Sequence, residues 1–488
     1  MPNAPRVATA GLCSAAPIRR IDTRFLSVTL DYALLLGAPW WEGTRRTARS
    51  FGNLPAPLVD LADFRLRRYA QALAPAYLRL GGSEADRIRY EMNGAAPAGV
   101  RTADYRSVLT AERWDELCRF AAESDLDLFV TVNAGPGPRL NDGSWDPENA
   151  RELVSHAAGC RQPVAVWELG NEVNGFPFIH GLSRRISPRQ YAADFARFDE
   201  LIRHYAPEAR TAGPASAVWP LLGEVFPTIP GFLKQAPRKP DIVTWHYYPQ
   251  QSSRGVVATR RADPYRVLKP RRLDAVSGWA RRIARHVRRS AGPAGAEIWL
   301  GETGHALYGG EPGVSDRFIA GLWWMDQLGL LARTGVGLIA RQSLVGGDYG
   351  LLDSSSLKPR PDYWSSLLWK GLMGEDVYAA VADGGRRLRV YAHRSRRGDG
   401  VTLLVINVDR SRSVRVHVDA DSLGFTPRRL DLYLVTAPDP LSAELHINGM
   451  APALPDHPGA PPAPPRQLSA ADGVPVPPLS YAFVTAVT

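Results

Sequence analysis

The feature that most constrains the fold of this chain is a regular alternation of short apolar runs with longer segments of helical periodicity. We count eight strand-like runs, at residues 25–31, 76–80, 127–133, 164–172, 209–213, 241–248, 297–302 and 337–342. Helix-period segments lie between them, for example at 114–123, 188–205, 273–289 and 315–334. A strand followed by a helix is the unit of a parallel sheet, and eight such units predict an α/β fold, a (β/α)8 TIM barrel over residues 25–374.

The sequence pattern changes near residue 376. From there, β-branched residues alternate with other residues, and the helical spacing of apolar residues is lost. Runs such as RLRVYAHR, VTLLVINV and SVRVHVDA, and the turn pair Asn448-Gly449, are typical of antiparallel strands. Residues 375–488 are therefore predicted to form a C-terminal β-sandwich domain that a proline-rich surface segment interrupts. Residues 1–24 are too few for a domain, and an edge strand of the sandwich is the role we expect for this N-terminal extension.

The charge balance points to an anionic partner. The chain carries 59 lysine and arginine residues against 49 aspartate and glutamate residues, a net charge of +10. A field of this sign favours encounter with nucleic acid, an acidic polysaccharide or a membrane surface. Part of the excess surrounds one predicted helix, at Arg271, Arg272, Arg281, Arg282, Arg285, Arg288 and Arg289. These arginines form either the solvated outer face of a helix or a polyanion site.

Two of these partner classes lack support in the sequence. No recognised nucleic-acid motif accompanies the arginines, so we expect no nucleic-acid partner. No apolar run reaches the roughly 18 residues that a membrane-spanning helix needs, so no membrane span is expected.

The cysteines and the N-terminus bear on the compartment. Cys13, Cys118 and Cys160 cannot all pair within one chain, and their spacing matches no metal motif. We therefore assume no structural disulfide and predict no metal site. The first 17 residues lack the basic region and apolar core of a secretion signal. Either the protein is cytoplasmic or a signal has been removed from the sequence.

Two glutamates fall at the ends of predicted barrel strands, Glu172 at the fourth and Glu302 at the seventh. Chemistry in (β/α)8 enzymes takes place at these carboxyl-terminal ends. Two carboxyl groups about 5 to 5.5 Å apart are the machinery of a retaining glycosidase, in which one attacks the anomeric carbon and the other protonates the leaving oxygen. Because the pair and water suffice, no metal or organic cofactor is implied.

The neighbours of the two glutamates fit this chemistry. Asn171 offers an amide to a sugar hydroxyl beside the scissile bond, and the small residue before Glu302 allows close approach of a sugar ring. His246 and Tyr248, at the end of the sixth run, are placed to donate to the nucleophile, with an aromatic core pair as the alternative. Glu168, inside the fourth strand, is a rival acid for which a structural hydrogen-bonding role is preferred.

Several motifs occur in a family-specific order: PAYLRLGG, WELGNEVN, VTWHYY, WLGETGHALYGG, ARQSLVGGDYGLLD and PDYWSSLLWKGLMG. In these segments the chain resembles glycoside hydrolase family 79, the heparanase family, and the ending PPLSYAFVT extends the resemblance to nearly the whole chain. The resemblance implies that Asn171 precedes the general acid/base Glu172 and that Glu302 is the nucleophile.

The resemblance also implies a sugar with a carboxylate. That carboxylate would be held by Tyr308 and by the backbone N–H groups of Gly309 and Gly310, since consecutive N–H groups in a glycine turn bind anions. Further sugar contacts implied by the motifs are Asp31, Gln342 and Tyr349.

The expected function is therefore a retaining endo-β-glucuronidase that hydrolyses internal bonds of a heparan-type acidic polysaccharide. An exo-acting β-glucuronidase and, in a different class, a non-catalytic polysaccharide-binding protein are the alternatives. Residues 213–219 depart from the glutamine and arginine that animal members of the family present toward sulfated sugars, so sulfate recognition is not implied. An extracellular substrate favours a secreted or periplasmic protein, with a cytoplasmic one as the alternative.

Overall fold

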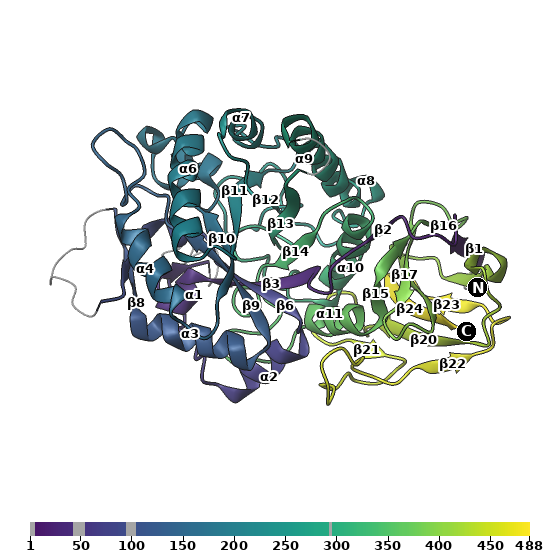
Figure 1. Cartoon of the computed structure of the whole chain (residues 1–488). Coiled ribbons are helices and arrows are strands. Elements are labelled where there is room, and N and C mark those ends of the chain that lie inside the picture. Colours follow the sequence, from purple (N-terminus) through teal and green to yellow (C-terminus); the bar gives the residue numbers. More distant parts are fainter. Residues whose placement is uncertain (1–4, 42–53, 94–103, 292–294) are drawn as a thin grey trace.

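The computed structural model describes residues 5–41, 54–93, 104–291 and 295–488 (Figure 1). Eight parallel strands close into a barrel in the spatial order β10-β11-β12-β13-β14-β3-β6-β9. They are β3 (Leu26–Asp31), β6 (Ala76–Gly81), β9 (Leu126–Val132), β10 (Val164–Leu169), β11 (Arg210–Val218), β12 (Ile242–Tyr247), β13 (Glu297–Thr303) and β14 (Leu338–Arg341). Each corresponds to one of the eight predicted runs, and the predicted (β/α)8 barrel is confirmed.

Helices cover the outside of the barrel (Figure 1). The longer ones are α2 (Phe64–Ala72), α3 (Ala111–Glu123), α4 (Glu148–Ala158), α6 (Pro188–Tyr205), α7 (Ile229–Gln235), α9 (Ala275–Ala291), α10 (Phe318–Ala332) and α11 (Pro361–Leu372). The start of α6 shows why the chain becomes helical there. The Ser187 hydroxyl accepts from the Gln190 N–H and Pro188 occupies the first turn, where its missing N–H costs nothing.

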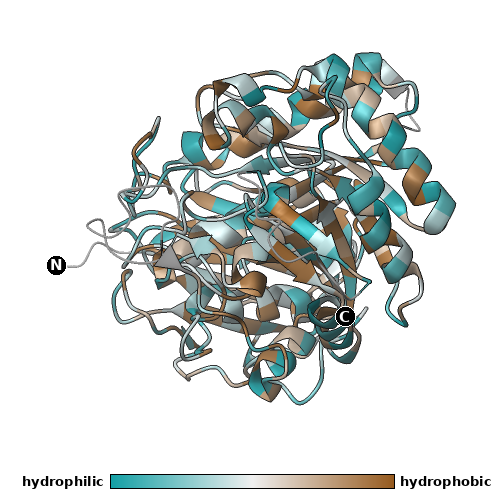
Figure 2. Cartoon of the chain, turned by 90° about the vertical axis from the view of Figure 1, so that its left-hand side faces the viewer, coloured by the Kyte–Doolittle hydropathy of each residue, from teal (hydrophilic) through white to brown (hydrophobic). Residues whose placement is uncertain are grey.

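The connections carry short elements. They are α1 (Tyr32–Leu36), α5 (Phe176–Ile179), α8 (Pro270–Leu273), η1 (Ala85–Arg87), η2 (Val173–Gly175), η3 (Leu182–Arg184), β4 (Pro39–Trp40), β5 (Leu54–Pro55), β7 (Ile88–Glu91) and β8 (Ser107–Thr110). The barrel strands are buried on both faces, as parallel strands between helices must be. Figure 2 accordingly shows hydrophobic residues on the central strands and more hydrophilic ones on the surrounding helices.

Two further sheets pack face to face beside the barrel, and both described chain ends lie there (Figure 1). The smaller has the order β16 (Ala380–Ala382), β1 (Arg6–Leu12), β19 (Val414–Val418), β23 (Val474–Val476). The larger has the order β2 (Arg19–Arg20), β15 (Met373–Tyr378), β17 (Leu388–Ser395), β18 (Gly400–Asn407), β24 (Ser480–Val487), β20 (Arg429–Thr436), β21 (His446–Ile447). In addition, β22 (Arg466–Leu468) pairs with β20, and α12 (Ala420–Leu423) follows β19. The predicted β-sandwich is thus present.

The N-terminal extension contributes two strands to the sandwich, one inside a sheet and one at an edge. Strand β1 lies between β16 and β19, paired antiparallel with the first and parallel with the second. Its alternate residues Ala8 and Ala10 are buried in the sandwich core. The short strand β2 is the one that forms a sheet edge, next to β15.

The larger sheet has two buried faces, which explains how the sandwich joins the barrel. Val390 and Leu403 face the smaller sheet, whereas their neighbours Tyr391 and Leu404 belong to the core shared with the barrel helices. This is the period-two alternation of a strand. Across the junction, the Tyr391 hydroxyl donates to Asp326 of α10 at 2.6 Å. Helix α10 is buried all round, because the barrel covers one side and the sheet the other.

The arginine-rich segment forms the outer face of α9. On α9, Arg281, Arg285 and Arg288 are exposed while Ile283 and Val287 are buried, which is the arrangement of a solvated outer face. Within the described part of the chain, no helix combines the length and apolarity needed to cross a bilayer.

Candidate active site

A cleft of about 350 Å³ opens at the carboxyl-terminal ends of the barrel strands. Seven of the predicted site residues line it: Asp31, Glu172, Tyr248, Glu302, Tyr308, Gln342 and Tyr349. Asn171 and His246 are buried directly beside the two glutamates. Gly309 and Gly310 are not among the lining residues of the cleft. The structure therefore brings nearly all of the predicted side chains together.

The two predicted catalytic carboxylates face each other across His246. One oxygen of Glu172, one of Glu302 and a ring nitrogen of His246 all lie within 4.8 Å of one another. The His246 Nδ1 atom is 3.2 Å from Glu172 Oε1 and 3.9 Å from Glu302 Oε2. The same three groups could ligate a cation, although Glu302 already has a cationic partner in Arg79.

Glu172 departs slightly from its predicted position at a strand end. Strand β10 ends at Leu169, and Glu172 lies three residues later with a left-handed backbone, φ 53°. Its N–H donates to the Ala215 carbonyl of β11 at 3.0 Å. This turn out of the strand aims the side chain into the cleft, whereas Glu302 remains inside β13.

Arg79 organises the floor of the site, and the sequence analysis did not identify it. Its guanidinium donates to Glu302 Oε2 at 3.1 Å, to Glu168 Oε2 at 2.7 Å and to Asn171 Oδ1 at 3.0 Å. Its side chain is fully buried, so these are charge-assisted bonds in a low-dielectric interior. Glu168 is equally buried and also accepts from Thr131, which matches the structural role preferred for it. One arginine thus holds the nucleophile candidate and the Asn171 amide in register.

The two glycines of the LRLGG motif make room for this arrangement. A Cβ atom on Gly81 would lie 2.5 Å from Arg79 Nη1, and one on Gly82 would lie 1.9 Å from Asp31 Oδ2. Gly82 also has a positive φ of 93° and donates its N–H to Asn171 Oδ1 at 3.2 Å. A side chain at either position would displace a site residue.

Removing the guanidinium should cost more stability than any surface ion pair. We expect Arg79→Ala to lower the free energy of unfolding by about 3 to 5 kcal/mol, because Glu168 and Glu302 would remain buried without their cation. Chemical denaturation measures this change. Arg20→Ala, which breaks an exposed pair with Glu375, is the matched control and should leave the denaturation midpoint nearly unchanged. Equal denaturation midpoints for the two variants would show that Arg79 does not neutralise the buried acids.

The surroundings set the two glutamates different tasks. Burial raises the pKa of Glu172 to about 7, against the opposing effect of Arg79, so this carboxyl group is poised to hold a proton. Burial lowers the pKa of His246 to about 4, which keeps its ring neutral beside both acids. The Tyr248 hydroxyl donates to Glu302 Oε1 at 2.7 Å. Arg79 donates to the other oxygen, so both oxygens of Glu302 accept hydrogen bonds.

A second group of polar side chains lies along the cleft wall. Gln342 donates through Nε2 to Asp31 Oδ2 at 3.3 Å and to the Tyr349 hydroxyl at 3.4 Å. Asp31 also accepts from the Ala33 N–H at 2.9 Å, where it caps α1. Burial raises the pKa of Asp31 well above its usual value. These three side chains present a network of donors and acceptors suited to sugar hydroxyls.

The predicted carboxylate-binding turn is only partly available. Tyr308, Gly309 and Gly310 all have positive φ values, 68°, 78° and 87°. The Gly310 N–H already donates to the Ala306 carbonyl at 3.1 Å, so it is not an open donor in this conformation. The Tyr308 hydroxyl donates to the Val257 carbonyl at 3.0 Å at the cleft edge. The sequence predicted two glycine N–H groups that could bind the carboxylate. In this conformation the Gly310 N–H is not one of them, which leaves at most that of Gly309.

The outer rim of the cleft is apolar. Phe178, Leu222 and Val257 line it with exposed fractions of 57%, 59% and 59%, and come from the connections after β10, β11 and β12. Trp41 and Trp219 lie deeper and contact the Tyr308 ring at 5.0 and 6.5 Å. Both arginines that line the cleft already have partners there. Arg106 pairs with Glu84, and Arg87 donates to the Ile179 carbonyl at 2.9 Å.

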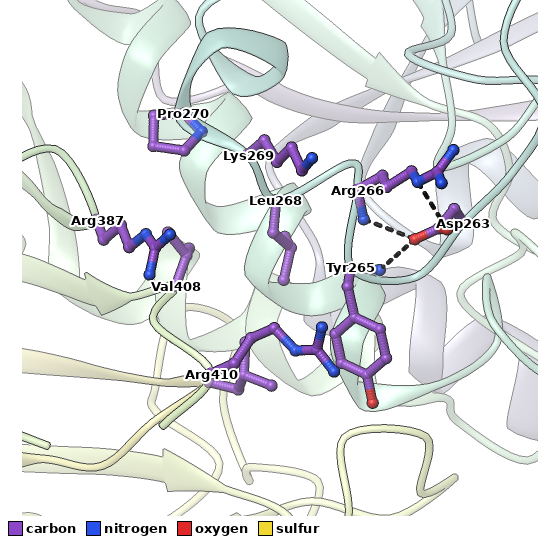
Figure 3. Close-up of a pocket in the computed structure, with 10 residues that line it drawn as sticks. Asp263, Tyr265, Arg266, Leu268, Lys269, Pro270, Arg387, Val408 and Arg410 are labelled. Carbon is purple, nitrogen blue, oxygen red and sulfur yellow. Dashed lines mark hydrogen bonds and ion pairs between the residues drawn. The ribbon is translucent and has the colours of Figure 1, made fainter. Parts of the chain in front are cut away.

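A second hollow, of about 380 Å³, lies where the barrel meets the sandwich (Figure 3). Its walls carry four cationic side chains: Arg266, Lys269, Arg387 and Arg410. The Arg410 guanidinium lies over the Tyr265 ring at 4.0 Å. Asp263 is the one acid among the residues that line this hollow, so a two-carboxylate reaction belongs to the cleft.

Two facing carboxylates at the mouth of a (β/α)8 barrel are the active-site arrangement of a glycoside hydrolase, and the comparisons place the protein in that class. Residues 9–329 match the glycosyl hydrolase family 79 N-terminal domain, and the chain belongs to that family. Over 96% of its length it is 30% identical to heparanase from Bos taurus, covering 89% of that protein. It is 27% identical to baicalin-beta-D-glucuronidase from Scutellaria baicalensis, over 89% of this chain and 83% of that one.

Solved structures support the same fold. The chain superposes on alpha-L-arabinofuranosidase from Thermotoga maritima with a TM-score of 0.70 at 15% identity, covering 99% of this chain and 100% of the other. A 4-O-alpha-L-rhamnosyl-beta-D-glucuronidase from Fusarium oxysporum 12S gives a TM-score of 0.66 at 16% identity, over 98% and 99% of the two chains. At these identities the likeness concerns the fold alone.

Proposed function

We propose that the protein is a retaining β-glucuronidase in which Glu302 is the nucleophile and Glu172 the general acid/base. The observation that carries the proposal is the short distance between the two carboxylates. One oxygen of Glu172 and one oxygen of Glu302 lie within 4.8 Å of each other. Retaining enzymes hold their carboxyl groups about 5 to 5.5 Å apart, whereas inverting enzymes leave about 6.5 to 9.5 Å for a water molecule.

The proposed reaction has two steps. Glu302 attacks the anomeric carbon while Glu172 gives its proton to the leaving oxygen, so a glycosyl ester forms as the glycosidic bond breaks. Glu172, now ionised, then takes a proton from water, which attacks the same carbon and releases Glu302. Arg79 and Tyr248 hold Glu302 in place for both steps. Because Asn171 Oδ1 accepts from Arg79, its NH2 group is the donor for a sugar hydroxyl.

The sugar is proposed to be a glucuronic acid. Tyr308, which lines the cleft, and the adjacent Gly309 N–H are the groups proposed to receive its carboxylate. Asp31, Gln342 and Tyr349 are proposed to bind its hydroxyls. The names of the relatives, heparanase and a β-glucuronidase, support the same substrate class. Replacement of the substrate carboxylate by hydroxymethyl should remove activity, and comparable rates on aryl β-glucosides and β-glucuronides would refute this assignment.

The proposal predicts an alkaline limit on the rate. Glu172 must be protonated to donate, and burial raises its pKa to about 7, so kcat/KM should fall as the pH rises through about 7. Above that, the decline should be about tenfold for each pH unit. For an activated aryl glucuronide, whose leaving group needs no proton, kcat/KM should not fall in this pH range. If kcat/KM fell in the same way for both substrates, the fall would have to be assigned to the titration of another group.

Two kinds of substrate are candidates, and they differ in the group that would occupy the leaving-group side of the cleft. The net charge of +10 supports endo action on internal bonds of a heparan-type acidic polysaccharide. The apolar rim of Phe178, Leu222 and Val257 supports exo action on glucuronides of a small apolar aglycone instead. If the substrate is the extracellular polysaccharide, the proposal includes secretion of the protein.

Product sizing separates the two candidates. Heparan sulfate and an aryl β-glucuronide are digested in parallel, and the products are resolved by size. A ladder of oligosaccharides identifies endo action, whereas monomer alone identifies exo action. Phe178→Ala should raise KM for the aryl glucuronide if the rim binds the aglycone, while Leu182→Ala, exposed and outside the cleft lining, serves as the control.

A further inference from the structure

The segment that follows β12 wraps around the turn to which the substrate carboxylate was assigned. Gly255 packs directly against the Tyr308 ring, since a Cβ atom on this glycine would lie 1.9 Å from Tyr308 Cε2. The Tyr308 hydroxyl donates to the Val257 carbonyl at 3.0 Å, and the Ser252 N–H donates to the Leu307 carbonyl at 3.0 Å. The shape of the turn therefore depends on a segment that is distant from it in sequence.

Arg254 is the side chain of this segment that reaches the turn backbone. Its guanidinium donates through Nη1 to the Gly310 carbonyl at 2.9 Å and to the Gly309 carbonyl at 3.4 Å. The side chain is 5% exposed, and Arg254 is not one of the residues that line the cleft. Arg254 therefore acts on the turn from behind, and the geometry gives it no contact with the substrate.

An acid from the connection after β14 completes the arrangement. Asp348 forms an ion pair with Arg254, with 2.5 Å between Oδ2 and Nη2. The Asp348 N–H also donates to the Gly309 carbonyl at 2.6 Å. The connections after β12, β13 and β14 thus meet at the turn, and the buried charge of Arg254 has its counter-ion there.

These contacts hold the peptide unit between Gly309 and Gly310 on both sides. Its carbonyl accepts from Arg254 and from the Asp348 N–H, and its N–H donates to the Ala306 carbonyl at 3.1 Å. The next peptide unit presents the Gly310 carbonyl to the same guanidinium. The direction of the preceding Gly309 N–H follows from the backbone angles of Gly309, with φ at 78°, which these bonds fix.

We propose that Arg254 is a positioning residue that gives the site its preference for a sugar carboxylate, and that Asp348 holds Arg254 in place. The inference rests on the proposed β-glucuronidase function. The turn has three consecutive positive φ values, 68°, 78° and 87°, the first of them at Tyr308, where a side chain makes this conformation costly. Without its cationic donor the turn should relax. The guanidinium also places a buried positive charge behind the turn, which strengthens its attraction for an anion.

Kinetics on an aryl β-glucuronide test the proposal through the separate changes in KM and kcat. Arg254→Met removes the hydrogen bonds and the charge at similar side-chain length. We expect KM to rise about tenfold or more, the loss typical of a charged hydrogen-bonding group. The value of kcat should change less than about threefold, because the turn holds the carboxylate equally in the ground state and the transition state. Arg254→Lys keeps the charge without the planar fork, so its KM should lie between the other two.

Asp348→Asn is the matched control, because it breaks the same ion pair from the other side. The amide oxygen can still accept from Arg254, and loss of the negative charge makes the turn more attractive to an anion, so KM should stay unchanged or fall. If the pair were merely structural, Arg254→Met and Asp348→Asn would raise KM together, and that result would overturn the proposal. Should Arg254→Met not fold, as judged by circular dichroism, the KM values of Arg254→Lys and Asp348→Asn provide the same comparison.

Failure of this inference can be told apart from failure of the proposed function. A wild-type protein that does not hydrolyse the aryl β-glucuronide would refute the function and the inference together. An active wild type whose KM is unchanged in folded Arg254→Met would refute the inference alone.

Discussion

Glu302→Gln should reduce kcat by ~10⁴-fold or more on any glucuronide, including one with an activated leaving group. The amide cannot form the glycosyl ester, so no choice of leaving group compensates for its loss. The neighbouring contacts should survive with one reversed direction, because the glutamine oxygen can still accept from Arg79 Nη1 while its NH2 group donates to the Tyr248 hydroxyl oxygen. Steady-state kinetics and the circular dichroism of the folded variant measure both parts of the expectation.

The matched control lies on the same strand. Glu297 stands at the opposite, amino-terminal end of β13, where it pairs with Arg210 on the surface at 2.9 Å. Glu297→Gln should therefore keep nearly full activity. If Glu302→Gln kept more than about a tenth of the wild-type rate, the nucleophile would have to be assigned elsewhere.

Glu172→Ala should lower kcat/KM by about 10² to 10⁴-fold on a glucuronide with a poor leaving group. With an activated aryl leaving group the first step needs no acid, so the glycosyl ester forms and then waits for a base. Added azide, which needs no proton removed, should restore turnover and yield a glycosyl azide of the same β configuration as the substrate.

The pattern of rescue separates Glu172 from Glu168. Glu168 is fully buried and bonded to Arg79, so azide has no access to the space that Glu168→Ala would leave. That variant should lose activity or stability without rescue. Azide rescue of Glu168→Ala, or none for Glu172→Ala, would reverse the roles given to the two acids.

The barrel could be predicted from the sequence because each strand is a short apolar run followed by a helical segment. All eight runs recur as barrel strands, and α6 has the predicted bounds. The sites of Glu172 and Glu302 could be predicted to converge for the same reason, since strand ends meet at one mouth. The two-residue glycine motif beside them was visible, but its reason, room for Arg79 and Asp31, became clear only in three dimensions.

Other features depend on contacts between distant residues. A charged residue inside the run AYLRL was a signal for Arg79, yet its partners are 89 and 223 residues away. The engagement of the Gly310 N–H depends on how the turn closes on Ala306, which composition does not encode.

The most direct test of the two-carboxylate account is the configuration of the first product. An aryl β-glucuronide is hydrolysed in a nuclear magnetic resonance tube, and the anomeric proton of glucuronic acid is followed before mutarotation. The double displacement through Glu302 predicts that β-glucuronic acid appears first and the α anomer only later. First appearance of the α anomer would mean direct attack by water and would contradict the proposed roles of both glutamates.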